Sequence, residues 1–271
     1  MQARLPRLPR LPRIPHHKGV YILPNLFTSA SLFAGFLGLL WASSGQYENC
    51  AVAIFVSAVM DGLDGKVARL TGTSSEFGIQ YDSLADLVAF GVTPSFMVYQ
   101  MALHEYSRLG IAVAFLFTVC SALRLARFNV STSTAGKLFF TGLPTPAAGC
   151  ALAMLVMVLQ YMPGFIRDAF PGICLAVTAL IAYLMVSRVR YAAFKEFGFV
   201  KAHPFRYMVF AILIFAALIA QPIFFGFLML FGYIASGIIY TFIIMPRKGL
   251  TGRGDTPPPS PEEPGNGPEN G

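Results

Sequence analysis

The strongest constraint on this chain is a series of apolar segments long enough to cross a lipid bilayer. A transmembrane helix needs about 20 mostly apolar residues. Of the 271 residues here, 55% are hydrophobic and only 12% are charged, whereas a soluble domain of this length carries far more surface charge. The sequence therefore predicts an all-α, polytopic membrane bundle of about eight transmembrane helices. They are expected near residues 21–42, 47–70, 78–101, 109–128, 144–162, 170–187, 206–220 and 222–244.

The basic residues predict how this bundle is oriented. With both termini in the cytoplasm, only Arg108 and Arg167 of the 20 Lys and Arg residues fall on the outer side. This is the asymmetry expected of a multi-pass protein of the inner (cytoplasmic) membrane. The net charge of +7 is explained by this topology and by attraction to anionic lipid. Nucleic-acid binding would require a soluble basic face, and the sequence predicts none.

The two ends of the chain differ in composition from its apolar middle. Residues 1–18 form a basic, Pro-rich N-terminal arm, in which the repeat "RLPRLPRLPRIP" excludes a helix. Residues 249–271 form a tail of proline, glycine and acidic residues that is expected to be disordered. Residues 19–248 are predicted to be one membrane domain. The four cysteines have no metal-ligand or redox spacing and are expected to be small core residues.

Four aspartates inside two adjacent apolar segments are the main candidate functional residues: Asp61, Asp64, Asp82 and Asp86. A lipid-facing aspartate costs about 2.5–3.5 kcal/mol, so these side chains are expected to face the bundle interior or a wet cavity. Spacings of three and four residues put each pair on one helix face. Two antiparallel helices can then aim all four carboxylates at one point. Because four anions repel one another, bound Mg²⁺ or Mn²⁺ is expected there, in an arrangement suited to phosphoryl transfer.

The spacing of these aspartates carries a family resemblance. The pattern Asp61-x2-Asp64-Gly65-x2-Ala68-Arg69-x8-Gly78-x3-Asp82-x3-Asp86 resembles, without departure, the motif of the CDP-alcohol phosphotransferases. Four more segments resemble the bacterial branch of that family that uses serine as its acceptor. They are "YILPNLFTSASLFAGFLGL", "SALRLARFNV", "FTGLPTPAAG" and "VSRVRYAAFKEF". The resemblance covers about residues 19–245 and leaves out both tails.

The resemblance implies a fold, a set of partners and roles for particular residues. It implies a membrane-embedded homodimer with its active site open to the cytoplasm and with CDP-diacylglycerol and L-serine as substrates. It also implies that Asp61, Asp64 and Asp82 bind a divalent metal, and that Asp86 both touches the metal and acts as general base. The nucleotide site implied by the resemblance is lined by Asn25, Thr28, Gly65, Ala68, Arg69 and Gly78.

The expected reaction is a direct displacement in which the serine hydroxyl attacks a phosphoryl group of CDP-diacylglycerol, giving phosphatidylserine and CMP. A hydroxyl is a poor nucleophile, so a base within hydrogen-bond reach is needed, and Asp86 is the candidate. The serine carboxylate needs cationic partners. The candidates are Arg124, Arg127, Arg188 and Lys195, each of which has membrane-interface anchoring as its alternative role. Arg124 and Arg127 are three residues apart, so they are expected to share one helix face.

The sequence leaves two other functions open. A different acceptor, such as glycerol 3-phosphate, an inositol compound or choline, would leave the aspartate motif unchanged. A cation-coupled membrane transporter also places carboxylates within the bilayer. Against a transporter, the acids here gather in one cytoplasmic half, and the sequence shows no inverted repeat.

Overall fold

The computed structural model describes residues 22–72, 75–131, 139–187, 189–192 and 204–241. Within these ranges the chain is almost entirely helical, as the sequence predicts. The elements in chain order are α1 (Ile22–Ser43), α2 (Tyr47–Thr71), α3 (Glu76–Asp86), the π-helix η1 (Leu87–Val92), α4 (Thr93–Met101), the 3₁₀ helix η2 (Leu103–Tyr106), α5 (Ser107–Ser131), β1 (Phe139–Thr141), α6 (Thr145–Val158), the 3₁₀ helix η3 (Leu159–Tyr161), α7 (Gly164–Val186), β2 (Arg190–Ala192), α9 (Pro204–Ala220) and α10 (Pro222–Ile239).

Four helical segments of the described chain are long and apolar enough to cross a membrane: Pro24–Ser43, Leu103–Val130, Gly164–Val186 and Pro222–Ile239. The helices at the other expected spans differ from these four in charge, continuity or length. Helix α2 carries the first aspartate pair together with basic residues, and the expected span at 78–101 is divided among α3, η1 and α4. Helices α6 and α9 have only 14 and 17 residues. The structure therefore supports a helical membrane protein, and the count of eight spans stays a prediction.

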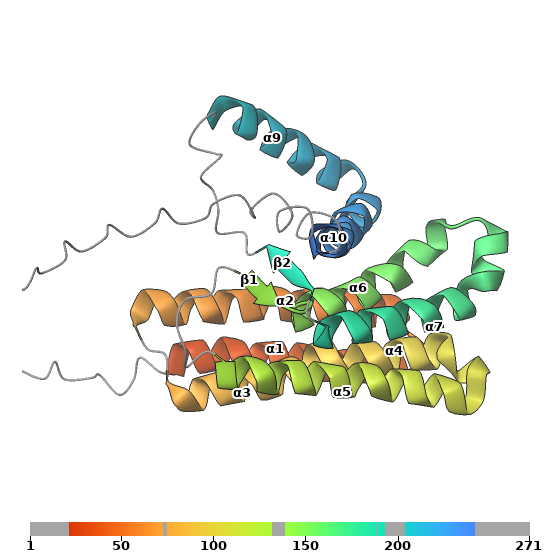
Figure 1. Cartoon of the computed structure of the whole chain (residues 1–271), viewed down its shortest axis with the longest axis horizontal. Helices are drawn as coiled ribbons and strands as arrows, with labels where there is room; N and C mark the ends of the chain where they lie inside the picture. The colour runs from red at the N-terminus through yellow and green to blue at the C-terminus, as the bar shows by residue number, and fades with distance from the viewer. Residues whose placement is uncertain (1–21, 73–74, 132–138, 188, 193–203, 242–271) are drawn as a thin grey trace, which may run out of the picture.

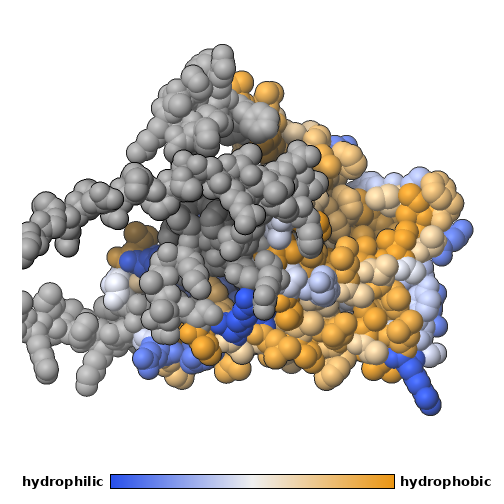
Figure 2. Space-filling view, in the orientation of Figure 1, coloured by the Kyte–Doolittle hydropathy of each residue, from blue (hydrophilic) through white to orange (hydrophobic). Residues whose placement is uncertain are grey.

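Most of the helices lie side by side along the long axis of the molecule (Figure 1). Helix α1 packs along α2, α5 packs against α7, and α2 packs against α6. Helix α10 crosses one side of this bundle on α6, and α9 contacts α10. Hydrophobic side chains cover much of the visible bundle surface (Figure 2), as lipid contact requires. All four cysteines are buried and free.

A short pair of strands is a departure from the predicted all-helical fold. Strands β1 and β2 pair antiparallel, with Phe139 opposite Ala192 and Thr141 opposite Arg190. Next to the pair, Gly142 has a φ of 87°, and a Cβ at this position would collide with the carbonyl of Met185. Strands of three residues are too short for a hydrophobic period to reveal, so the sequence did not predict them.

The helix expected at 78–101 changes its winding at Pro94. Proline lacks a backbone N–H and so interrupts α-helical hydrogen bonding. The π-helix η1 precedes it, and there the backbone N–H of Thr93 bonds to the carbonyl of Val88. The Thr93 hydroxyl also donates to the carbonyls of Val88, at 2.9 Å, and of Gly35 in α1, at 3.0 Å. Short π-turns are frequent at functional sites, and this one begins directly after Asp86.

Small residues allow α1 and α6 to approach η1 closely. A Cβ added to Gly35 would lie 2.8 Å from Cα of Ala89, and one added to Gly149 would lie 2.9 Å from Cα of Phe90. Both distances are shorter than a real Cβ contact, so neither position accepts a side chain without a backbone shift. Close approach at small residues is the usual way in which membrane helices pack. This packing fixes η1, and with it Asp86, against α1 and α6.

Candidate active site

Three of the four aspartates meet between α2 and α3. One carboxylate oxygen each from Asp61, Asp64 and Asp82 lies within 4.8 Å of the others. Asp64 is buried, with 6% of its surface exposed, and the other two are half-buried. A cluster of carboxylate oxygens at this separation suits a hard divalent cation.

Asp86, the last residue of α3, extends this cluster toward the bundle interior. It is 8% exposed. Its carboxyl group and that of Asp82 both contact the carboxyl group of Asp61. Oδ1 of Asp86 has no hydrogen-bond partner within the described ranges. Because a buried carboxylate oxygen without a partner is costly, this oxygen is suited to receive a metal, a proton or a ligand donor.

Helix α1 supports the cluster through Thr28. The Thr28 hydroxyl donates to Oδ2 of Asp64 at 2.8 Å and to the carbonyl of Pro24 at 3.2 Å. Thr28 is 3% exposed, so water does not compete strongly for this contact. A hydrogen bond of this kind orients the carboxylate for whatever its other oxygen binds. Nearby, the hydroxyls of Ser31 and Ser57 lie 2.6 Å apart and join α1 to α2.

A cavity of about 210 Å³ opens beside the aspartates. Asp64 and Asp82 are part of its wall. The wall also contains every residue expected at the nucleotide site: Asn25, Thr28, Gly65, Ala68, Arg69 and Gly78. These residues come from α1, the end of α2 and the start of α3, so the cavity exists only because three helices converge.

The start of α3 shapes one wall of this cavity. The backbone N–H of Gly78 donates to the side-chain oxygen of Ser75 at 3.0 Å, which caps the helix. A Cβ at Gly78 would lie 3.2 Å from that same oxygen and 3.5 Å from Oδ1 of Asn25. A side chain at position 78 would therefore press on the capping Ser75 and lie in ordinary van der Waals contact with Asn25. Ser75 was not predicted as a cavity residue, although a serine directly before a helix is a typical cap.

Arg124 is the acceptor-site candidate that the structure places near the aspartates. Its Nη1 donates to the hydroxyl of Thr145 at 2.8 Å. It lies within electrostatic reach of Asp86 and of Tyr233 in α10. The buried Nε of Arg124 has no hydrogen-bond partner among the described residues. The sequence did not single out Thr145, because only the fold brings the start of α6 to α5.

The other three acceptor-site candidates are placed differently. Arg127 was expected on the same helix face as Arg124, but its side chain is exposed, whereas Arg124 is half-buried. Three residues along an α-helix turn by about 300°, which leaves these side chains about 60° apart. That difference is enough to turn one inward and the other outward. Arg188 and Lys195 lie outside the described residues.

Polar contacts that the sequence did not reveal hold α3 in position. The hydroxyls of Ser29 in α1 and Tyr81 in α3 lie 2.8 Å apart. Nδ2 of Asn129 in α5 donates to the hydroxyl of Ser83 at 3.0 Å. Helix α3 is therefore fixed from two sides, and its two aspartates are fixed with it.

The fold and the site define a membrane-embedded transferase. The chain belongs to the CDP-alcohol phosphatidyltransferase family, whose model matches residues 21–184. That range contains the four aspartates, the cavity beside them and Arg124.

Similar proteins within this family have names that refer to serine. The chain is 44% identical over 177 residues to the CDP-diacylglycerol–serine O-phosphatidyltransferase of Helicobacter pylori (strain ATCC 700392 / 26695), covering 65% of this chain and 74% of that protein. It is 32% identical over 175 residues to the protein of the same name from Bacillus subtilis (strain 168), covering 64% of this chain and 92% of that protein. The archaetidylserine synthase of Methanothermobacter thermautotrophicus is 32% identical over 178 residues, covering 65% of this chain and 72% of that protein.

Proposed function

We propose that the chain is a phosphatidylserine synthase, a CDP-diacylglycerol–serine O-phosphatidyltransferase. It transfers the phosphatidyl group from CDP-diacylglycerol to the hydroxyl of L-serine and releases CMP. The observation that carries the proposal is the convergence of the aspartate cluster with a cavity lined by the motif residues of α1, α2 and α3. The choice of serine as acceptor is supported by the names of the bacterial and archaeal relatives.

The four aspartates fit a divalent metal ion, Mg²⁺ or Mn²⁺. Asp61, Asp64 and Asp82 offer oxygens within 4.8 Å of one another, and the unpartnered Oδ1 of Asp86 adds a further donor. Both ions prefer oxygen ligands of this kind. When bound, the metal supplies positive charge that stabilises the diphosphate oxygens.

The remaining steps are carried out by the chain's own residues. The cavity residues hold the cytidine diphosphate group, and the Arg69 guanidinium pairs with phosphate oxygens. Asp86 accepts the proton of the serine hydroxyl as the hydroxyl oxygen bonds to the phosphorus that carries diacylglycerol. The bond from that phosphorus to the bridging oxygen breaks, and CMP leaves with the electron pair. Arg124 pairs with the serine carboxylate.

The proposed setting is the inner (cytoplasmic) membrane, with eight spans, a homodimeric assembly, and the termini and active site on the cytoplasmic side. Residues 19–248 form the catalytic membrane domain between the arm at 1–18 and the tail at 249–271. The distribution of the 20 Lys and Arg residues supports this orientation.

Thiol labelling of intact cells tests this orientation. The four native cysteines are buried, so the background should be low. An impermeant reagent applied from outside should label Gln46→Cys, in the turn before α2. It should not label Gly72→Cys, in the turn after α2, and the opposite pattern would reverse the assigned topology.

An acceptor panel tests the proposed reaction. Purified protein in detergent is given labelled CDP-diacylglycerol, divalent metal and one acceptor at a time: serine, glycerol 3-phosphate, inositol phosphate or choline. Phosphatidylserine and CMP are expected with serine alone. CMP release without any ion gradient distinguishes a transferase from a transporter. Product from glycerol 3-phosphate and none from serine would contradict the proposed acceptor.

A further inference from the structure

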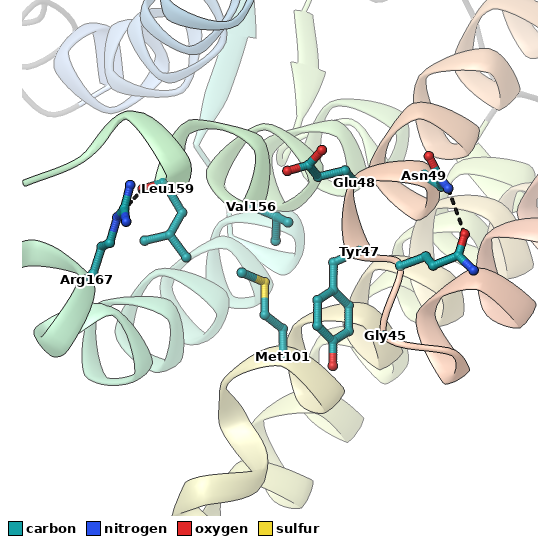
Figure 3. Close-up of a pocket in the computed structure, with 9 residues that line it drawn as sticks. Gly45, Tyr47, Glu48, Asn49, Met101, Val156, Leu159 and Arg167 are labelled. Atoms are coloured by element: carbon teal, nitrogen blue, oxygen red, sulfur yellow. Dashed lines mark hydrogen bonds between the residues drawn. The ribbon is translucent and has the colours of Figure 1, made fainter. Parts of the chain in front are cut away.

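A second cavity, of about 540 Å³, lies at the opposite end of the bundle from the aspartates. It is formed where α1 turns into α2 and where α6 is followed by η3 and α7 (Figure 3). Tyr47 begins α2 and lines this cavity, whereas Asp61 lies fourteen residues further along the same helix. At 1.5 Å per residue the two are about 21 Å apart along the helix. The cavity is therefore separate from the candidate active site.

The cavity combines opposite charges with an apolar floor. In Figure 3, Glu48 of α2 and Arg167 of α7 lie on different sides, with Val156 and Leu159 between them. Nε of Arg167 donates to the carbonyl of Leu159 at 3.4 Å, which holds the guanidinium at one wall. Glu48 is exposed and has no ion-pair partner in the described part of the chain. Met101 adds to the apolar lining. Such a cavity suits a ligand with one cationic and one anionic group.

The helix face that carries Glu48 indicates that this ligand is a lipid. Val52, Val56 and Val59 follow Glu48 at spacings of four, four and three residues, which keeps them on one side of α2. They are 47%, 42% and 58% exposed. In a bilayer these valines contact acyl chains. Glu48 therefore lies where the same face passes from the acyl region to the headgroup region.

We propose that this cavity binds the headgroup of a zwitterionic phospholipid of the phosphatidylethanolamine type. The primary ammonium donates to the carboxylate of Glu48, and the phosphate pairs with the guanidinium of Arg167. The acyl chains lie along the exposed valines of α2. A trimethylated ammonium has no N–H donor for Glu48, and a headgroup without a cation leaves Glu48 unpaired. The cavity volume lies within the range of about 300–1,000 Å³ that is typical of small-ligand sites.

The single tryptophan of the chain provides a reporter for this site. Trp41 lies in the last turn of α1, and its carbonyl accepts a hydrogen bond from the backbone N–H of the cavity residue Gln46 at 2.8 Å. The full chain is reconstituted in phosphatidylcholine with brominated acyl chains, which quench tryptophan fluorescence. Unbrominated phosphatidylethanolamine, phosphatidylcholine or phosphatidylglycerol then replaces it stepwise. Phosphatidylethanolamine should relieve quenching at about threefold lower mole fraction than phosphatidylcholine or phosphatidylglycerol. A threefold preference is about the size of effect expected from one solvent-exposed ion pair.

Variants test whether the charges of Glu48 and Arg167 cause the preference for phosphatidylethanolamine. Glu48→Gln and Arg167→Gln should each remove the threefold preference. Asp168→Asn, which changes an exposed charge next to Arg167 that does not line the cavity, should keep it. All three variants should retain transferase activity, which checks their folding. Equal relief by the three lipids in the native protein, or a preference that survives Glu48→Gln, would overturn the proposal. Relief by soluble phosphoethanolamine at the same concentration would also overturn it, because that molecule has no acyl chains for the valine face.

Discussion

The guanidinium of Arg124 in α5 donates a 2.8 Å hydrogen bond to the hydroxyl of Thr145, a fully buried residue at the start of α6. This contact fixes a long, flexible cation beside Asp86, at the inner side of the aspartate cluster. A buried hydrogen bond to a charged group contributes about 1.5–3 kcal/mol. Under the proposed function, in which Arg124 pairs with the serine carboxylate, we therefore propose Thr145 as a positioning residue that orients Arg124.

Thr145→Val tests this positioning role. Valine keeps the shape of threonine but offers no acceptor to Arg124. The KM for serine should rise about three- to tenfold, with a smaller change in kcat, because the contact orients the binding group rather than the reacting atoms. Thr145→Ser should restore the native KM. Thr178→Val, which removes an equally buried hydroxyl from α7, should leave the serine KM unchanged. An unchanged KM in Thr145→Val would contradict the assignment.

Arg124→Lys and Arg127→Lys form a matched pair on one helix. Lysine keeps the charge but cannot present the planar fork that binds a carboxylate at two points. Because Arg124 is half-buried beside the aspartates and Arg127 is exposed, the first variant should raise the serine KM and the second should change it little. Steady-state kinetics with varied serine concentration measures both. An equal rise in the serine KM for both variants would mean that both arginines contact the acceptor. An unchanged serine KM for both would favour membrane anchoring as their role.

Asp86→Asn removes the proposed proton acceptor while preserving the size of the side chain. Turnover should fall by about 10²–10⁴-fold, the usual contribution of a general base. Binding of CDP-diacylglycerol should largely survive, because the nucleotide cavity is lined by other residues. Single-turnover product formation and equilibrium binding of labelled CDP-diacylglycerol separate these effects. Near-normal turnover would remove Asp86 from the base role.

Thr28→Val breaks the 2.8 Å hydrogen bond to Asp64. Loss of a contact that orients a metal ligand typically lowers metal affinity about 10- to 100-fold. The Mg²⁺ or Mn²⁺ concentration for half-maximal activity should rise accordingly, and direct metal titration of the chelated protein should show the same shift. Thr178→Val, which makes the same change at a buried threonine of α7, is the control and should leave the metal requirement unchanged. Full activity of the native enzyme after chelation would exclude a metal role for the cluster.

Gly149→Ala tests the close packing of α6 on η1. The added Cβ would lie 2.9 Å from Cα and from the carbonyl oxygen of Phe90, so the helices must separate. Overpacking of this kind costs about 1–3 kcal/mol, and the midpoint of thermal unfolding in detergent should fall. Gly232→Ala in α10, where a Cβ meets nothing within 4 Å, should leave the midpoint unchanged or raise it. A midpoint in Gly149→Ala that matches Gly232→Ala would contradict the packing argument.

Helical periodicity in the sequence predicted most of the arrangement of the aspartates that the structure shows. The spacing of Asp61 and Asp64 predicts a shared face on one helix, and that of Asp82 and Asp86 predicts the same on the next. The structure brings oxygens of the first three within 4.8 Å. The expected nucleotide residues also share one cavity, because they lie near the same end of three adjacent helices. The roles assigned to these residues stay predictions until the variants are measured.

The sequence was less informative where two helices distant in the chain meet. It placed Arg124 and Arg127 together, but a turn of about 60° between them leaves one half-buried and the other exposed. It did not reveal Thr145 as the partner of Arg124. It also did not reveal the π-helix η1, which begins directly after Asp86.

By itself, the sequence determined the membrane character, the family and the positions of the acidic residues, because hydrophobic length and residue spacing are local properties of the chain. Only the tertiary structure decided which polar groups meet across helices. The Thr28–Asp64 and Arg124–Thr145 hydrogen bonds and the charged cavity at the far end of the bundle depend on helix rotation and close approach. The packing of side chains between non-adjacent segments sets both of these, and no local pattern encodes them.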